Sequence, residues 1–256
     1  MRHSFLFLIL SIMALTPGTA AQHNLSLAEV KAVELQLDDV MEVMDTILLK
    51  AKMQETERQF EEQPTLLNKV RLGIIYHEAA LNLSFLSRTA YKGYAKRSFE
   101  ILSDVFDAPS TTKAIMPFVA SYRASALSLV GAETKKLGLV GDSFRLLNDA
   151  VEKYAHVSYL PEFLRGSVSE NLPWFFFSKR HYAKRDFESI ISKYESNSAY
   201  ANKKIMSFTY WAWSNQHQSK KYRKQALAYL DAAIALDPAY KAGRQRAEQL
   251  KAKLTK

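Results

Sequence analysis

Hydrophobic positions recur at intervals of three and four residues along almost the whole chain. In residues 26–62 they alternate with acidic side chains at this spacing, which predicts one or two amphipathic helices. Ser26 and Glu29 have the spacing of a capping box, so the first helix should begin there. Further helical patterns cover residues 66–87, 94–107, 112–130, 142–156, 160–171, 182–195, 199–216, 222–236 and 239–254. No strand is predicted, because the strand-like run 172–177 contains Pro173.

The helical pattern repeats. The motif Tyr-Ala-Lys-Arg-Ser-Phe-Glu at 94–100 returns as Tyr-Ala-Lys-Arg-Asp-Phe-Glu at 182–188, and more loosely at 222–228. Counting a fourth copy, the equivalent apolar residues are Phe99, Phe144, Phe187 and Leu227. They are 45, 43 and 40 residues apart, and each copy follows a longer, more apolar helix. The predicted unit is a helix hairpin of 40–45 residues, which must stack on its neighbours to bury both apolar faces.

The last hairpin resembles a tetratricopeptide repeat. Ala226, Leu230, Ala233 and Pro238 have the spacing of that family's second helix, in which small residues allow close helix approach and proline ends the helix. Where Ala226 stands, the earlier copies carry Ser98, Ser143 and Asp186. Those copies are also longer than the family's regular unit. The resemblance therefore implies a degenerate repeat array.

A second resemblance covers residues 118–187. The segments that carry it are Tyr122–Ala126, Phe163–Gly166, Asn171–Phe176 and Asp186–Phe187. They are similar to the middle of an uncharacterised family of secreted bacterial helical-repeat proteins. That resemblance agrees with export and implies no activity.

The N-terminus has the features of a secretory signal. Arg2 precedes the eleven-residue apolar run Phe5–Leu15, Pro17-Gly18 breaks the run, and small residues lead to a cleavage site after Ala21, with cleavage after Ala20 as the alternative. The alternative is a membrane anchor, but a span needs about 20 apolar residues. We therefore expect an exported protein, periplasmic or extracellular.

These patterns predict an all-α chain built as a helical-hairpin, tetratricopeptide-like solenoid with an N-terminal helical extension. The expected parts are a signal peptide at 1–21, the extension at 22–64, the hairpin repeats at 65–238 and a capping helix at 239–256. Whether residues 26–62 pack on the hairpins or reach away from them stays open at this point.

Composition supports this fold class. Eight glycines and seven prolines in 256 residues, with 48% hydrophobic residues, exclude a disordered chain and disfavour a turn-rich β fold. The absence of cysteine excludes disulfides, thiolate metal sites and a cysteine nucleophile. Charge is uneven: residues 26–62 hold ten acids and four bases, whereas residues 63–256 hold 16 acids and 30 bases. A basic surface could attract an acidic partner or anionic lipid, although such charges usually only solvate helix faces.

Catalytic and metal motifs are weak. His77-Glu78 opens a zinc-protease pattern, but Leu81 stands where the second histidine is needed. No phosphate-binding glycine loop or Gly-x-Ser-x-Gly elbow is present, and Gly141-Asp142 is interpreted as a loop that ends in an Asp N-cap. We expect no enzyme activity, no cofactor and no metal.

Two arginines lie in apolar first helices of the hairpins, which should line the concave side of a solenoid. Arg123 and Arg165 could bind a carboxylate or phosphate there; alternatively, they form internal pairs, for instance with Glu162 or Glu170. Tyr122, Trp174 and Trp211 are further candidate contacts, with Lys179, Arg180, Lys184 and Arg185 as a basic rim. At helical spacing, however, aromatic residues more often belong to the core.

The function expected from the sequence is that of a non-enzymatic exported scaffold that binds a protein or peptide, with an acidic partner favoured by the charge. The alternative is an envelope small-ligand or transporter-associated binding component with an apolar cavity. A nucleic-acid partner is not expected, peripheral contact with an anionic envelope surface is conceivable, and oligomeric state is not predicted.

Overall fold

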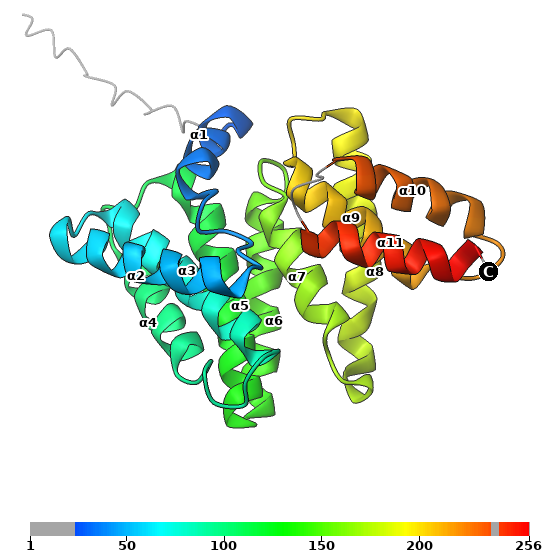
Figure 1. Cartoon of the computed structure of the whole chain (residues 1–256). Helices are drawn as coiled ribbons and strands as arrows, with labels where there is room; N and C mark the ends of the chain where they lie inside the picture. The colour runs from blue at the N-terminus through cyan, green and yellow to red at the C-terminus, as the bar shows by residue number, and fades with distance from the viewer. Residues whose placement is uncertain (1–23, 237–240, 256) are drawn as a thin grey trace, which may run out of the picture.

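The computed structural model describes residues 24–236 and 241–255, and all regular structure within these ranges is helical (Figure 1). The elements are α1 (Leu27–Leu37), α2 (Thr46–Glu62), α3 (Leu66–Ser84), α4 (Tyr94–Asp107), η1 (Lys113–Ile115), α5 (Met116–Thr134), α6 (Leu137–Tyr154), α7 (Leu160–Glu170), η2 (Trp174–Phe176), α8 (Phe177–Ser196), α9 (Lys203–Gln216), α10 (Arg223–Leu236) and α11 (Lys241–Thr255). The all-α prediction is confirmed for these ranges. The predicted signal peptide and Pro238 lie outside the described residues.

The helices pack as neighbouring pairs: α3 with α4, α5 with α6, α7 with α8, and α9 with α10. Each second helix buries a small or short residue at the same repeat position, and these residues are Ser98, Ser143, Asp186 and Ala226. The repeat found in the sequence is therefore a structural repeat. The apolar residue that follows each of these positions is not equally buried in the four hairpins. Phe144 and Phe187 are buried, whereas Phe99 and Leu227 are half-buried.

Close contact between paired helices explains the small residues. The Ser98 hydroxyl donates to the Gly73 carbonyl at 2.7 Å, and the Ser143 hydroxyl donates to the Ala124 carbonyl at 2.8 Å. A Cβ added at Gly73 would lie 2.6 Å from Leu102 Cγ, which is closer than real Cβ contacts allow. The first and second helices of these hairpins approach to a distance that larger side chains would prevent.

The N-terminal extension packs on the hairpins. The capping box of α1 is present, with both the Ser26 and Glu29 side chains in place. The buried Glu34 carboxylate accepts hydrogen bonds from Tyr159 and Asn202, at 2.8 Å each. Residues 26–62 thus contact helices far along the chain, which answers the question that the sequence left open.

The link between α1 and α2, residues 38–45, crosses the first helices of the hairpins. Arg71 of α3 donates two hydrogen bonds of 2.7 Å to the Asp39 carboxylate, and Asn82 donates to the Val43 carbonyl at 3.2 Å. Val40, Met41 and Val43 are buried in the common core. The inner side of the helix array is therefore partly filled by the chain's own N-terminal segment.

Two local predictions were wrong. The predicted loop at Gly141-Asp142 lies inside α6, which begins at Leu137 because its first turns pack closely on α5: a Cβ at Gly131 would meet Val140 Cγ2 at 3.1 Å. The helix predicted from 182 begins at Phe177, directly after η2. α7 ends at Glu170, three residues before Pro173, which could not continue a helix.

In the part of the chain that the structure describes, one helical stretch, Lys113–Thr134, is long and apolar enough to cross a membrane by length and composition. Most of it is buried against neighbouring helices, and the central helix of a helical array gives the same pattern. It corresponds to η1 and α5.

Candidate functional site

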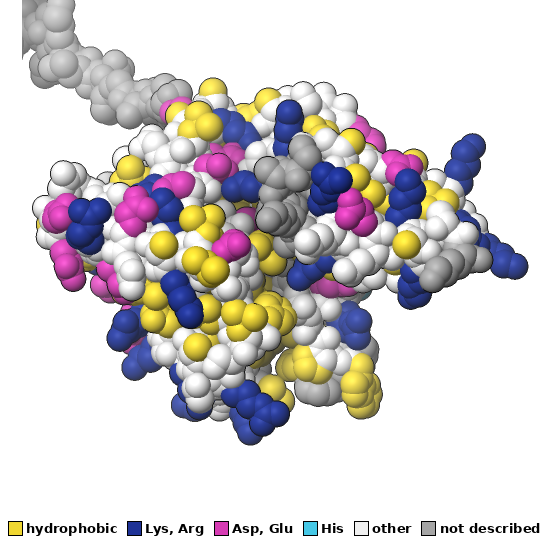
Figure 2. Space-filling model, viewed as in Figure 1, with side chains coloured by type: hydrophobic (Ala, Val, Ile, Leu, Met, Phe, Trp, Pro, Cys, Tyr) yellow, Lys and Arg dark blue, Asp and Glu magenta, His cyan; other side chains and the backbone are white. Residues whose placement is uncertain are grey.

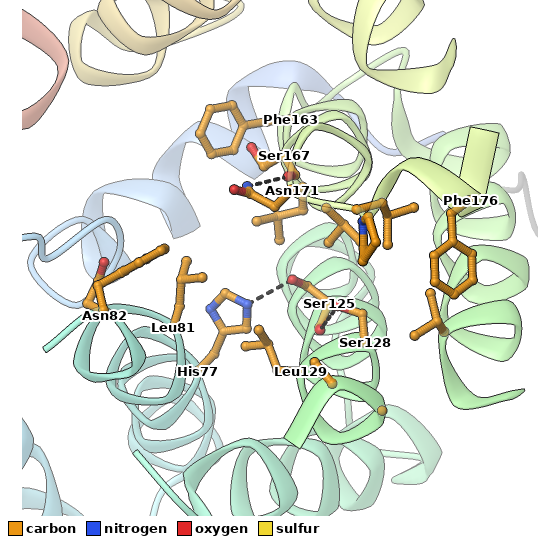
Figure 3. Close-up of a pocket in the computed structure, with 18 of the residues that line it drawn as sticks. His77, Leu81, Asn82, Ser125, Ser128, Leu129, Phe163, Ser167, Asn171 and Phe176 are labelled. Atoms are coloured by element: carbon orange, nitrogen blue, oxygen red, sulfur yellow. Dashed lines mark hydrogen bonds between the residues drawn. The ribbon is translucent and has the colours of Figure 1, made fainter. Parts of the chain in front are cut away.

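A pocket of about 400 Å³ lies on the side of the array formed by the first helices of the hairpins (Figure 3). α3, α5, α7 and α9 contribute its walls, with the start of α6, the segment from Asn171 to Phe176 and one residue of α11. Its apolar lining includes Met44, Leu81, Phe85, Leu129, Leu137, Val140, Phe163, Leu164, Val168, Leu172, Phe176 and Phe208. Pockets of this size and character are typical of small-ligand sites.

Small side chains on α5 create the space. Ser125, Ser128, Gly131 and Ala132 lie on the wall that this helix contributes. The opposite wall is formed by larger residues, Phe163 and Leu164 of α7. The short side chains of Ser125, Ser128 and Ala132 leave room at this wall, whereas a side chain at Gly131 would point toward Val140 of α6.

The polar groups of the wall are mostly paired with each other. His77 Nε2 lies 2.8 Å from Ser125 Oγ, and Ser128 Oγ donates to the Ser125 carbonyl at 2.7 Å (Figure 3). The Asn171 amide donates to the Ser167 carbonyl at 2.8 Å. Ser167 Oγ, by contrast, is shielded from solvent and has no hydrogen-bond partner among the described residues. Three further residues that line the pocket are charged: Glu42, Lys135 and Arg246. The other polar residues of the walls, apart from Ser167, are paired.

The side chains of Ser125, His77 and Glu78 contact one another in the order of a catalytic triad, which consists of a nucleophile, a base and an acid. His77 Nδ1 lies 3.3 Å from a Glu78 carboxylate oxygen, and all three residues are buried. Ser125, however, stands in the middle of α5, where the backbone N–H groups are already used in helical hydrogen bonds. They are not available to stabilise an oxyanion. The geometry favours a polar tie between α3 and α5 over an acyl-transfer site.

Tyr122 packs against His77 in the core, and its hydroxyl has no hydrogen-bond partner among the described residues. Its ring packs edge-on against His77 with a centroid distance of 4.9 Å, and the residue is fully buried. Burial raises the pKa of its hydroxyl well above the ordinary value of 10.0, and the charge of Glu78 adds to the shift. Tyr122 was a candidate contact residue, but its position inside the fold takes it away from any ligand.

Arg165 is held by internal partners. Its Nε and Nη2 donate to the two Asp186 carboxylate oxygens at 2.7 and 2.6 Å, and Nη1 donates to Asn148 Oδ1 at 2.9 Å. The guanidinium also lies 4.5 Å from the centre of the Tyr182 ring. The structure therefore gives Arg165 an internal pair, with Asp186 in place of Glu162 or Glu170. Burial raises the pKa of Asp186, and the arginine opposes that shift.

Arg123 is half-buried between hairpins. Its guanidinium lies 4.5 Å from the centre of the Phe106 ring, and Nε donates to Ser103 Oγ at 2.9 Å. Burial lowers the pKa of the guanidinium below its ordinary value. These contacts join α5 to α4 and leave the guanidinium without a carboxylate partner among the described residues.

The other candidates are spread over the surface. Trp174 is 79% exposed, whereas Trp211 is half-buried between Phe208 and Arg246. Of the rim residues, Lys179, Lys184 and Arg185 lie over the rings of Phe144, Tyr222 and Tyr182, and Arg180 is exposed. None of the nine candidates from the sequence lines the pocket, although Trp174 follows Pro173, which does.

Sequence reasoning missed the residues that do form the pocket. His77 was considered only as a zinc ligand. The small residues Ser125, Ser128, Gly131 and Ala132, spaced at three- and four-residue intervals on α5, were the signal that could have shown where this wall lies. Among the residues described, no group of three or more His, Asp or Glu side chains could hold a metal ion.

Comparison of the chain with family models, curated proteins and solved structures gives no match.

Proposed function

We propose that the protein is a non-enzymatic binding protein whose pocket takes the apolar part of a small amphiphilic ligand. The observation that carries this proposal is the pocket of about 400 Å³, with apolar side chains from five helices and few unpaired polar groups. This corresponds to the small-ligand alternative from the sequence analysis. Apolar surface removed from water supplies the binding energy, and the paired polar groups of the wall do not oppose it.

The N-terminal segment covers part of the surface formed by the first helices, and this supports a small-ligand pocket over a groove for an extended peptide. Residues 38–45 of the chain already lie across the first helices, tied by Asp39 to Arg71 and by the Val43 carbonyl to Asn82. An extended peptide would need that surface free, whereas a compact apolar group needs only the pocket beside it. Binding of a protein or peptide to the hairpins stays a prediction.

The fold supports a binding role in a second way. The four hairpins have the pairing and the small buried residues that a tetratricopeptide-like solenoid would need, and Ala226, Leu230 and Ala233 are all fully buried in α10. We infer a degenerate solenoid of this type. The signal-like N-terminus supports export, so we place the ligand in the periplasm or outside the cell.

A fluorescent fatty-acid probe tests the pocket. Dansyl-labelled undecanoic acid should bind to the purified protein saturably and in a 1:1 ratio, and unlabelled dodecanoate should displace it. Leu129→Trp and Val168→Trp place an indole in the pocket and should each weaken binding at least tenfold. Leu35→Trp is the matched control, because Leu35 is exposed and does not line the pocket.

Circular dichroism and thermal unfolding of each variant show whether weaker binding comes from a blocked pocket or from a misfolded protein. Equal affinity of folded Leu129→Trp, folded Val168→Trp and wild type would overturn the proposed site. The same conclusion would follow if the wild type gave no saturable signal with probes of several chain lengths.

A further inference from the structure

Three turns that join the first helix of a hairpin to the second lie together at one end of the molecule. They follow α3, α5 and α7, and they form the lower end of the view in Figure 1. The Gly93 backbone N–H donates to Glu133 at 3.0 Å, which ties the first turn to the second. Phe85, Lys135 and Leu172, one from each turn, line the same pocket. We call these turns, residues 85–93, 133–138 and 171–180, the turn end.

Exposed hydrophobic side chains concentrate at the turn end. In the described part of the chain, seven large hydrophobic residues are exposed, and four of them are here: Phe85, Leu86, Leu137 and Trp174. Leu86 is 64% exposed and Trp174 79% exposed. Two of the four, Phe85 and Leu137, also line the pocket. Exposed aromatic and aliphatic residues grouped in this way mark a surface that contacts an apolar partner. Tryptophan in particular prefers the boundary between water and lipid.

Unpaired cations surround these hydrophobic residues. The turn end holds six basic residues and one acid, and the basic residues are Arg88, Lys92, Lys135, Lys136, Lys179 and Arg180. None of the six has a carboxylate partner among the described residues, and the acid, Glu133, is held by Gly93. In Figure 2, Lys and Arg side chains and hydrophobic side chains occupy the lower tips of the molecule. The net positive charge of this surface would attract an anionic partner.

From this arrangement we infer that the turn end docks on a lipid bilayer that contains anionic lipids, with the pocket mouth toward the bilayer. The cations lie against the headgroups while Leu86 and Trp174 enter the interface, which is how peripheral proteins combine charge with apolar area. The inference goes beyond the proposed function, because it names the source from which an amphiphile reaches the pocket. An acidic protein would match the cations, but it would not explain the four exposed apolar residues of the turn end.

Vesicle sedimentation tests the docking surface. The full mature chain should bind vesicles of phosphatidylcholine with phosphatidylglycerol at least tenfold more tightly than vesicles of phosphatidylcholine alone, and 0.5 M salt should weaken binding because it screens the cations. Leu86→Ser with Trp174→Ser should reduce binding at least tenfold. The matched control is Leu35→Ser with Ile47→Ser, since these residues are 80% and 81% exposed on α1 and α2.

A second variant tests the charges: Arg88→Gln, Lys92→Gln, Lys136→Gln and Arg180→Gln together should remove the preference for anionic vesicles. None of the residues changed in either variant lines the pocket, so binding of the dansyl probe in solution should persist. If the variants no longer bind vesicles but still bind the dansyl probe, the inference is supported. The inference is overturned if the wild type binds both vesicle types equally. It is also overturned if the turn-end serine variant and the α1–α2 control variant bind vesicles equally. If only binding of the dansyl probe fails, the proposed pocket is contradicted and the docking surface is not.

Discussion

Arg165 and Asp186 form a buried two-pronged ion pair between the two helices of the third hairpin, with N–O distances of 2.7 and 2.6 Å. The pair stands at the repeat position that Ser98, Ser143 and Ala226 occupy in the other hairpins. Gly166 beside it leaves room for the Phe187 ring, whose atoms would lie 3.1 Å from an added Cβ. One hairpin thus uses a charge pair where the others use small residues.

Breaking this pair from one side should be costly. Arg165→Met leaves the Asp186 carboxylate buried without its partner, and removing one member of a buried pair costs about 3–5 kcal/mol. Arg165→Met with Asp186→Leu should be destabilised by less than the sum of the two single changes, because no charge is left unpaired. Urea unfolding of the four proteins gives the coupling energy; additive effects would show that the pair is not coupled as the distances indicate.

Gly73 and Gly141 should respond oppositely to alanine. Gly73→Ala forces a methyl group against Leu102 and should cost about 1–3 kcal/mol, as overpacking does. Gly141→Ala in α6 has open space around the new methyl group and should gain about 0.5–1 kcal/mol from helix propensity. Thermal unfolding of the two variants checks this. Similar changes in both would contradict the close packing of α3 on α4.

Acid should loosen the strap formed by residues 38–45. Burial alone would raise the pKa of Asp39, but hydrogen bonds and charge from Arg71 and Lys52 outweigh it, so the pKa lies below the ordinary 3.8. A carboxyl group with a lowered pKa in the folded state stabilises the fold above its unfolded pKa, and this contribution disappears as pH falls through the folded pKa. Asp39→Asn should therefore be less stable than the wild type at pH 6.

The stability gap between Asp39→Asn and the wild type should close as pH falls below about 3.8, the value expected for the unfolded carboxyl group. Urea unfolding at several pH values measures the gap. A gap that does not change with pH would show that the ion pair with Arg71 contributes nothing to folding.

Ser125 should not behave as a nucleophile. A fluorophosphonate probe should leave it unlabelled, because the helix around it has no free backbone N–H groups to hold an oxyanion. Ser125→Ala should instead destabilise the protein by about 1–3 kcal/mol, since His77 loses its partner at 2.8 Å. Mass spectrometry of the treated protein decides the matter. Stoichiometric labelling at Ser125 would contradict the non-enzymatic assignment.

Much of the fold was predictable from the sequence because helical period and repeats are local signals. The helix at 94–107 has the predicted bounds, and the capping box at Ser26 is present. The start of α6 was missed because a glycine-containing helix start carries no local sign of the packing that holds it. Tertiary contact with Gly131, not propensity, fixes that end.

The pocket was less predictable than the fold. Its walls come from positions as far apart as Glu42 and Arg246, and only the packing of the helices brings them together. Spacing along the chain cannot show which faces meet. The partner of Arg165 was missed for a related reason: Asp186 lies 21 residues away on the paired helix, at the repeat position where small residues were the rule.

The central claim, that the pocket between α3, α5 and α7 binds an apolar chain, is tested most directly by locating a heavy atom. Crystals grown with dodecanoic acid brominated at its terminal carbon should show an anomalous bromine peak among Leu81, Leu129 and Val168. A bound chain with its bromine elsewhere on the molecule, or crystals with no bromine peak at a saturating ligand concentration, would contradict the account.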